Sequence, residues 1–187
     1  KVVDENDKTK RYKFDKGFTY IENGRGKEFT KTLLEFENGS LKLIDNDDDG
    51  DIDYVIAEKV EYFVISAVDY VNNIIYDPNS AITELEYRND DTFFFDIVLD
   101  GKKAKMSELA ENMVLEVMQS SDEEVCIVRA SSKVINATLD GASEGSLVIG
   151  DKEYETNSYF KSVNEELIFG REYTFCLAAD MTITAAF

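Results

Sequence analysis

Six aspartates lie within nine residues of this chain, in the segment Asp45-Asn46-Asp47-Asp48-Asp49-Gly50-Asp51-Ile52-Asp53. The carboxylates of Asp45, Asp47 and Asp49 converge when the chain curls, and Gly50 permits the sharp turn that the curl requires. The carbonyl of Asp51 and the side chain of Asp53, directly or through water, complete a shell of hard oxygen ligands, which calcium prefers. The segment therefore predicts a calcium site formed by Asp45, Asp47, Asp49, Asp51 and Asp53.

The flanks of this loop exclude a helix-loop-helix calcium site. That site needs a bidentate Glu where this chain has Ile56, and residues 41–44 and 54–56 are typical of strands. The spacing is similar to the DxDxDGxxD loop between strands of extracellular β proteins, including integrin-type propeller repeats. A solvated acidic turn is the alternative, but repulsion among the aspartates favours a cation. We expect a dissociation constant on the order of 10⁻⁴ to 10⁻⁵ M.

Catalytic chemistry has little support in the sequence. The chain has no His, which excludes the usual nucleophilic triads and His-ligated metals. Glu84 with Glu86, or Asp90 with Asp91, is a conceivable glycosidase pair, but Trp is absent and residues 83–87 alternate like a strand with a solvated face. We predict that the chain is not an enzyme.

Two further features leave alternatives open. Consecutive aromatics at Phe93, Phe94 and Phe95 place rings on both faces of a strand, which suits either a core face and a face covered by a neighbouring unit or a platform for polysaccharide or protein. Cys126 and Cys176 each lie in an apolar run; buried free thiols are favoured, and a disulfide stays open.

Composition bounds the class of protein. Among 187 residues, 43% are hydrophobic, which indicates a folded chain, and the net charge of −19 makes nucleic acid and anionic membranes poor partners. Divalent cations outside a cell would neutralise such an excess of carboxylates. The chain has no apolar run long enough to span a membrane and no signal peptide, so we expect a piece of a longer protein.

The elements that position the loop are mostly strands. Aromatic and β-branched runs bounded by turn residues predict strands at Gly17–Ile21, Tyr54–Ile56, Val60–Ile65, Thr92–Leu99, Val125–Val128 and Tyr173–Leu177. Short helical turns are expected at residues 107–111, capped by Ser107, and at 30–36. The predicted class is all-β, mainly antiparallel, with one or two short helical turns. Recurring turn positions suggest tandem small β-barrel or sandwich-like units at 1–58, 59–131 and 132–187; the alternative is that the first two form one domain.

Residues 39–55, with the sequence GSLKLIDNDDDGDIDYV, resemble a segment of long cell-surface proteins of Clostridia and their relatives, which often carry surface-layer-homology domains. Residues 20–24, 100–102, 150–154 and 169–175 are similar to that family's recurring strand-turn-strand elements. Two departures are Asp48, where the family usually has Gly, and residues 56–58, which replace its usual Phe-Val.

This resemblance implies an extracellular, non-catalytic stalk module that is associated with a bacterial cell surface or wall. Its partners would be neighbouring modules of the same polypeptide, with cell-wall polysaccharide or another surface protein as further candidates. The alternative is a polysaccharide- or protein-binding module. Because the loop closes a hairpin just before the second unit, we also expect calcium to fix the angle between the first two units.

Overall fold

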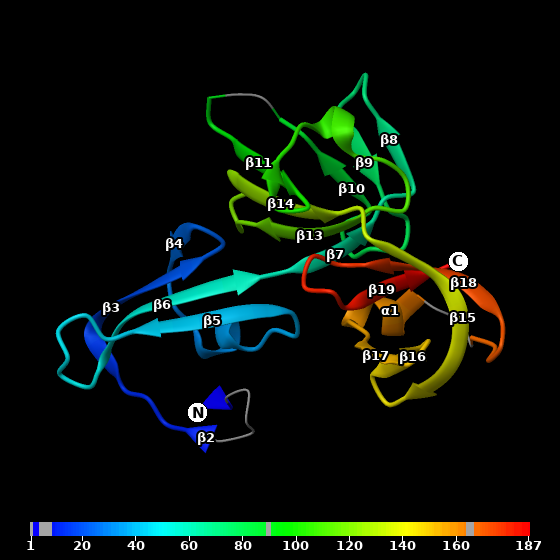
Figure 1. Cartoon of the computed structure of the whole chain (residues 1–187). Helices are drawn as coiled ribbons and strands as arrows, with labels where there is room; N and C mark the ends of the chain where they lie inside the picture. The colour runs from blue at the N-terminus through cyan, green and yellow to red at the C-terminus, as the bar shows by residue number, and fades with distance from the viewer. Residues whose placement is uncertain (1, 4–8, 89–90, 164–166) are drawn as a thin grey trace.

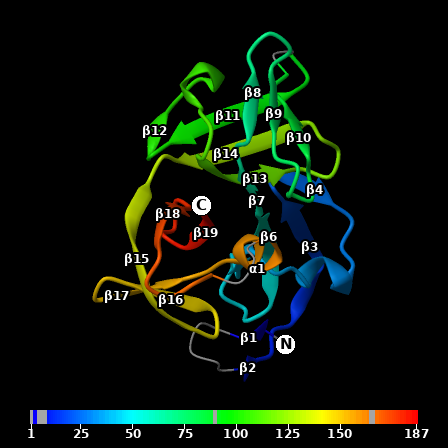
Figure 2. The ribbon, with the colours of Figure 1, turned by 90° about the vertical axis from the view of Figure 1, so that its right-hand side faces the viewer.

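The computed structural model describes residues 2–3, 9–88, 91–163 and 167–187. The chain is all-β, as predicted: its strands form several mainly antiparallel sheets, and the described residues contain one α-helix. The middle of the chain lies at the top of Figure 1, above the N-terminal sheet on the left and the C-terminal sheet on the right, and Figure 2 shows the same layout from the side.

The N-terminal sheet has the strand order β4-β3-β6-β5. Its elements are β3 (Phe14–Glu22), β4 (Arg25–Lys27), the 3₁₀ turn η1 (Lys31–Leu34), β5 (Gly39–Ile44) and β6 (Ile52–Lys59). The two central strands, β3 and β6, run parallel. Before this sheet, β1 (Val2–Val3) and β2 (Thr9–Lys10) pair with each other.

The middle segment forms a five-stranded sheet with the order β12-β11-β14-β13-β7 and a three-stranded sheet with the order β10-β9-β8. Its elements are β7 (Glu61–Val64), β8 (Ala67–Asp69), β9 (Ile74–Tyr76), β10 (Glu84–Glu86), β11 (Phe94–Leu99), β12 (Lys102–Lys103), η2 (Met106–Glu108), β13 (Val114–Gln119) and β14 (Val125–Ser131).

The C-terminal sheet has the order β17-β16-β15-β18-β19. Its elements are β15 (Val134–Ser143), β16 (Ser146–Ile149), β17 (Lys152–Glu155), α1 (Ser158–Val163), β18 (Glu172–Leu177) and β19 (Ile183–Ala186). The sheet curls until a single parallel bridge joins Thr156 to Ile183. The expectation of barrels is corrected here, because no sheet among the described strands closes: one bridge is not a ladder of hydrogen bonds.

The N-terminal sheet and the middle sheet share one topology. In each, a hairpin (β3–β4 or β11–β12), a 3₁₀ turn (η1 or η2) and a second hairpin (β5–β6 or β13–β14) follow one another. The first strand of the first hairpin lies parallel to the second strand of the second hairpin. The turns of the first hairpins also match. Asn23 and Asp100 have φ values of 46° and 48°. The Asn23 N–H donates to the Ala57 carbonyl and the Asp100 N–H to the Ala130 carbonyl, both at 3.0 Å. The division into three units stays a prediction.

Each large sheet has its own apolar core. Tyr20 and Val55 are central in the first, Phe63 and Leu115 in the second, and Phe175 in the third. A further cluster lies between the second and third sheets; it consists of Val64, Val114, Tyr159, Cys176, Ala178 and Ala185. Burial of this apolar surface joins the sheets to one another.

Most local predictions are confirmed, with shifts at the ends. The strand expected from Thr92 begins at Phe94, and the one expected from Val60 spans Glu61–Val64. The turn expected to be capped by Ser107 begins instead after Lys105, and Ser107 lies inside it. Sequence reasoning missed α1, although Asn157 gave a signal: its Oδ1 accepts a hydrogen bond from the Phe160 N–H at 3.1 Å, as an N-cap residue does.

Both cysteines are buried free thiols, as favoured from the sequence. Burial raises the pKa of Cys126 to about 12 and that of Cys176 to about 11. Both side chains therefore act as small apolar groups of their respective cores.

Candidate metal centre and the cavity between the sheets

The aspartate loop connects β5 to β6, as the sequence predicts. The last pair of the ladder is Ile44 with Tyr54, so the loop starts at Asp45 and ends at Asp53. Gly50 has a φ of 92°, and Asp48 has a φ of 61°. Both residues have left-handed backbone conformations, which Gly adopts without strain and Asp tolerates better than most residues.

Three carboxylates of the loop converge. Ligand oxygens of Asp45, Asp47 and Asp49 all lie within 4.8 Å of one another. Backbone N–H groups hold these side chains inward: Gly50 donates to Asp45 Oδ2 at 2.9 Å, and Asp51 donates to Asp49 Oδ1 at 2.8 Å. The other oxygen of Asp45, Oδ1, is buried and has no hydrogen-bond partner. A buried carboxylate oxygen in that state is suited to a cation.

The other two predicted ligands lie differently. The Asp51 carboxylate is 3.5 Å from Lys13 Nζ, which leaves the Asp51 carbonyl as its contribution to the loop. Asp53 Oδ2 accepts a hydrogen bond from the Asn46 N–H at 2.6 Å and so closes the base of the loop. Neither side chain belongs to the cluster of three. The complete ligand set stays a prediction.

The expectation that calcium fixes the angle between units is wrong in its geometry. Gly39 pairs with Lys59 at one end of the β5–β6 ladder, and the aspartate loop is at the other end. Figure 1 shows the loop at the far left and the passage from β6 to β7 near the centre, at the other end of β6. An ion in the loop would therefore hold the outer end of the hairpin.

Asn23 holds the junction instead. Its side chain is buried, its Nδ2 donates to the carbonyls of Lys59 at 3.1 Å and Gln119 at 2.8 Å, and its Oδ1 accepts from the Lys59 N–H at 2.8 Å. Nearby, Arg25 pairs with Asp122 at 2.8 Å and also with Glu124. The turn between β3 and β4 thus ties the first sheet to the end of β13.

Glu22 adds a buried charge next to this junction. Its carboxylate lies 2.7 Å from Lys59 Nζ and 3.1 Å from Lys27 Nζ, and it accepts from the Tyr20 hydroxyl at 2.9 Å. Burial by itself raises the pKa of Glu22, but the hydrogen bonds from Lys59, Lys27 and Tyr20 outweigh it and leave the pKa below its usual value.

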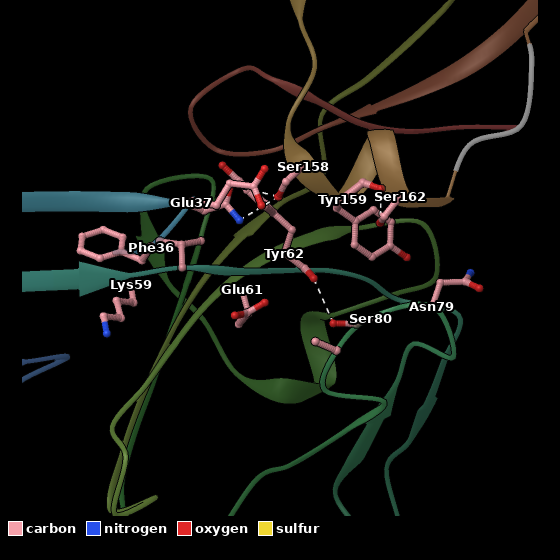
Figure 3. Close-up of a pocket in the computed structure, with 13 residues that line it drawn as sticks. Phe36, Glu37, Lys59, Glu61, Tyr62, Asn79, Ser80, Ser158, Tyr159 and Ser162 are labelled. Atoms are coloured by element: carbon pink, nitrogen blue, oxygen red, sulfur yellow. Dashed lines mark hydrogen bonds between the residues drawn. The ribbon is translucent and has the colours of Figure 1, made fainter. Parts of the chain in front are cut away.

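A cavity of about 370 Å³ lies where the three sheets meet (Figure 3). It is lined by residues 36–38, 59–62 and 79–81 and by Ser158, Tyr159 and Ser162. Several of its polar groups bond to one another: Asn38 Nδ2 donates to Ser158 Oγ at 2.7 Å, and Ser80 Oγ donates to the Tyr62 carbonyl at 3.1 Å. The volume is in the range of small-molecule sites.

Tyr159, which lines this cavity, makes a second buried contact between segments, with Asp77. Asp77 is 1% exposed and accepts hydrogen bonds from the Tyr159 hydroxyl at 2.8 Å and from the Val64 N–H at 2.6 Å. Burial, followed by the contact with Asp77, raises the pKa of Tyr159 above its usual range. This pair connects the three-stranded sheet region to α1.

The other candidate residues do not assemble into a site. Phe94 is 56% exposed, whereas Phe93 and Phe95 pack on the middle core, so the run presents one exposed ring. Glu84 and Glu86 lie on the exposed face of β10, and Glu86 pairs with Arg88 at 3.2 Å. Asp90 lies outside the described residues, and its neighbour Asp91 is exposed.

Comparison with known proteins gives no match to a family model, a curated protein or a solved structure. Among the helices in the described part of the chain, none has the length and apolar character needed to cross a membrane.

Proposed function

We propose that the loop Asp45–Asp53 binds a structural calcium ion and that the chain is a non-catalytic, extracellular module of a bacterial surface protein. The observation that supports the metal site is the convergence of Asp45, Asp47 and Asp49. Within this cluster, the buried Oδ1 of Asp45 has no hydrogen-bond partner. The carbonyl of Asp51 and the side chain of Asp53 would complete the shell.

The extracellular location is supported by the expected affinity and by charge. A site with a dissociation constant on the order of 10⁻⁴ M fills only where calcium is abundant, as outside cells. The net charge of −19 also suits a medium rich in divalent cations. Resemblance of the loop segment to clostridial surface proteins points to the same location, with neighbouring modules of the same polypeptide as partners.

Thermal unfolding with millimolar calcium, with magnesium and with chelator tests the metal. At calcium about fifty times above the dissociation constant, linkage stabilises the chain by about 2.3 kcal/mol. For a chain of this size, that corresponds to a rise of about 5–9 °C in Tm. Magnesium should give a much smaller rise, because it dehydrates reluctantly and demands octahedral geometry.

The matched variants are Asp45→Asn and Asp49→Asn against Asp48→Asn. All three remove one charge from the same loop, but Asp48 is not a predicted ligand, and Asn tolerates its left-handed backbone. The first two should lose most of the calcium-dependent rise, and the third should keep it. If all three variants lost the calcium-dependent rise in Tm equally, the loop would be a nonspecific acidic turn and not a calcium site. Protease accessibility of the chain on intact source cells tests the location separately.

The alternative, a polysaccharide- or protein-binding module, has one observation in its favour. The cavity between the sheets has the volume of a ligand site, and Glu37 and Glu61 both line it. Burial raises the pKa of Glu61. Calorimetric titration with cell-wall polysaccharide fragments tests this function: binding that Glu61→Gln weakens would favour it, and no heat at millimolar fragment would count against it.

A further inference from the structure

The edges of the sheets are protected unequally. The edge strands β4, β12 and β17 have three, two and four residues, and each carries at least one Lys or Arg. Short, charged edges resist pairing with other strands. By contrast, β5 has six residues, contains Leu41, Leu43 and Ile44, and has β6 as its single neighbour in the sheet. It is the longest open edge among the described sheets.

The alternation of an antiparallel ladder identifies which groups of β5 are free. Val60 N–H donates to the Asn38 carbonyl at 3.1 Å, so residues 38, 40, 42 and 44 bond to β6, and the N–H and C=O groups of Leu41 and Leu43 point outward. No hydrogen bond reaches these outward groups from any described residue. They form a template for a further strand.

The middle sheet shows such a strand at the corresponding edge. In the N-terminal sheet, Leu41 of β5 pairs with Ala57 of β6. In the middle sheet, Leu115 of β13 pairs with Ala130 of β14 in the same way, so β13 is the counterpart of β5. There, β7 covers the outward edge of β13 and pairs Phe63 with Leu115. In the C-terminal sheet, β15 covers β18 in the same antiparallel sense. In both cases, the covering strand is the first strand of its sheet in chain order.

In the N-terminal sheet, this position is not filled from within the described chain. The strands that precede β3 are β1 and β2, and they pair with each other. We propose that the edge of β5 accepts an antiparallel strand from a second polypeptide, with the apolar alternation of β7 and a basic residue at its N-terminal end. This pairing would extend the four-stranded sheet by one strand.

Charge defines the expected partner further. An antiparallel strand on β5 begins beside Asp45, where the acidic loop attracts a positive charge. The two covering strands inside this chain have that property, because Lys59 precedes β7 and Lys133 precedes β15. A second copy of this chain is less suitable, since its net charge is also −19.

A labelled peptide with the sequence of residues 59–66 is the probe, and fluorescence anisotropy with the full chain is the measurement. Ile65 N–H donates to Met113 in the native sheet, so the peptide should present the N–H groups of Phe63 and Ile65 to β5. N-methylation of Phe63 and Ile65 should weaken binding at least about tenfold, and N-methylation of Tyr62 and Val64 should weaken it far less. Amide hydrogen exchange should become slower at Leu41 and Leu43.

Four results would overturn the proposal: no binding at millimolar peptide, equal binding of both methylated peptides, binding without protection of Leu41 and Leu43, or protection of these amides by self-association in sedimentation experiments. The measurement is made in chelator as well as in calcium. Because strand pairing on β5 requires no metal, its failure leaves the calcium proposal untouched, and the reverse also holds.

Discussion

Replacing Asn23 with Asp tests the idea that one buried amide holds the first two sheets together. The substitution changes an NH₂ group into an oxygen with almost no change in shape. In the wild type, this group donates to the carbonyls of Lys59 and Gln119 over 3.1 and 2.8 Å. In Asn23→Asp, a carboxylate oxygen would face both carbonyls, while the Lys59 N–H keeps its acceptor.

The cost follows from the two lost hydrogen bonds. Each is worth about 0.5–1.5 kcal/mol, and leaving buried carbonyls without a donor adds to the loss. We expect the free energy of unfolding to fall by about 2–4 kcal/mol. At about 2–4 °C per kcal/mol for a chain of this size, a 3 kcal/mol loss lowers Tm by about 6–12 °C.

Calorimetry of the variant beside Asn73→Asp provides the assay. Asn73 is exposed and also left-handed, with a φ of 58°, so it controls for the charge and the backbone conformation. The loss in Asn23→Asp should shrink at acid pH, because a protonated carboxyl can donate to one of the two carbonyls. A Tm decrease no larger than that of Asn73→Asp, or one that is independent of pH, would refute the bridging role of Asn23.

Two further predictions concern single residues. Asp48→Gly should raise the free energy of unfolding in chelator by about 0.5–1 kcal/mol in urea titrations, because Gly adopts the φ of 61° without strain; a decrease would contradict the strain argument. Burial, together with the charge of Asp180, raises the pKa of Glu116, although its carboxylate accepts the Ala179 N–H at 2.9 Å. The folded state therefore favours protonated Glu116, and the wild type should lose stability as pH rises from about 4.3 through the raised pKa. Glu116→Gln should gain relative to the wild type over that window, and a constant difference in urea midpoints would contradict this.

The sequence determined most local structure and the inner half of the metal loop. Aromatic and β-branched runs give strands because their side chains fit a pleated, half-buried surface. The convergence of Asp45, Asp47 and Asp49 follows from spacing and from the left-handed Gly50, both of which are local. The α-helix at Ser158–Val163 escaped prediction because it is short and has no apolar period, and Asn157 was its clearest sign.

Tertiary structure decided which strands pair and which edges stay open. The parallel contact of β3 with β6 and the single bridge between Thr156 and Ile183 depend on burial across segments far apart in the chain. No local pattern shows that Asn23 reaches Gln119, or that the Asp51 carboxylate lies near Lys13 and away from the ligand cluster. Turn chemistry and spacing act within a few residues, whereas strand partners are chosen by the free energy of burying whole faces, which only the folded chain defines.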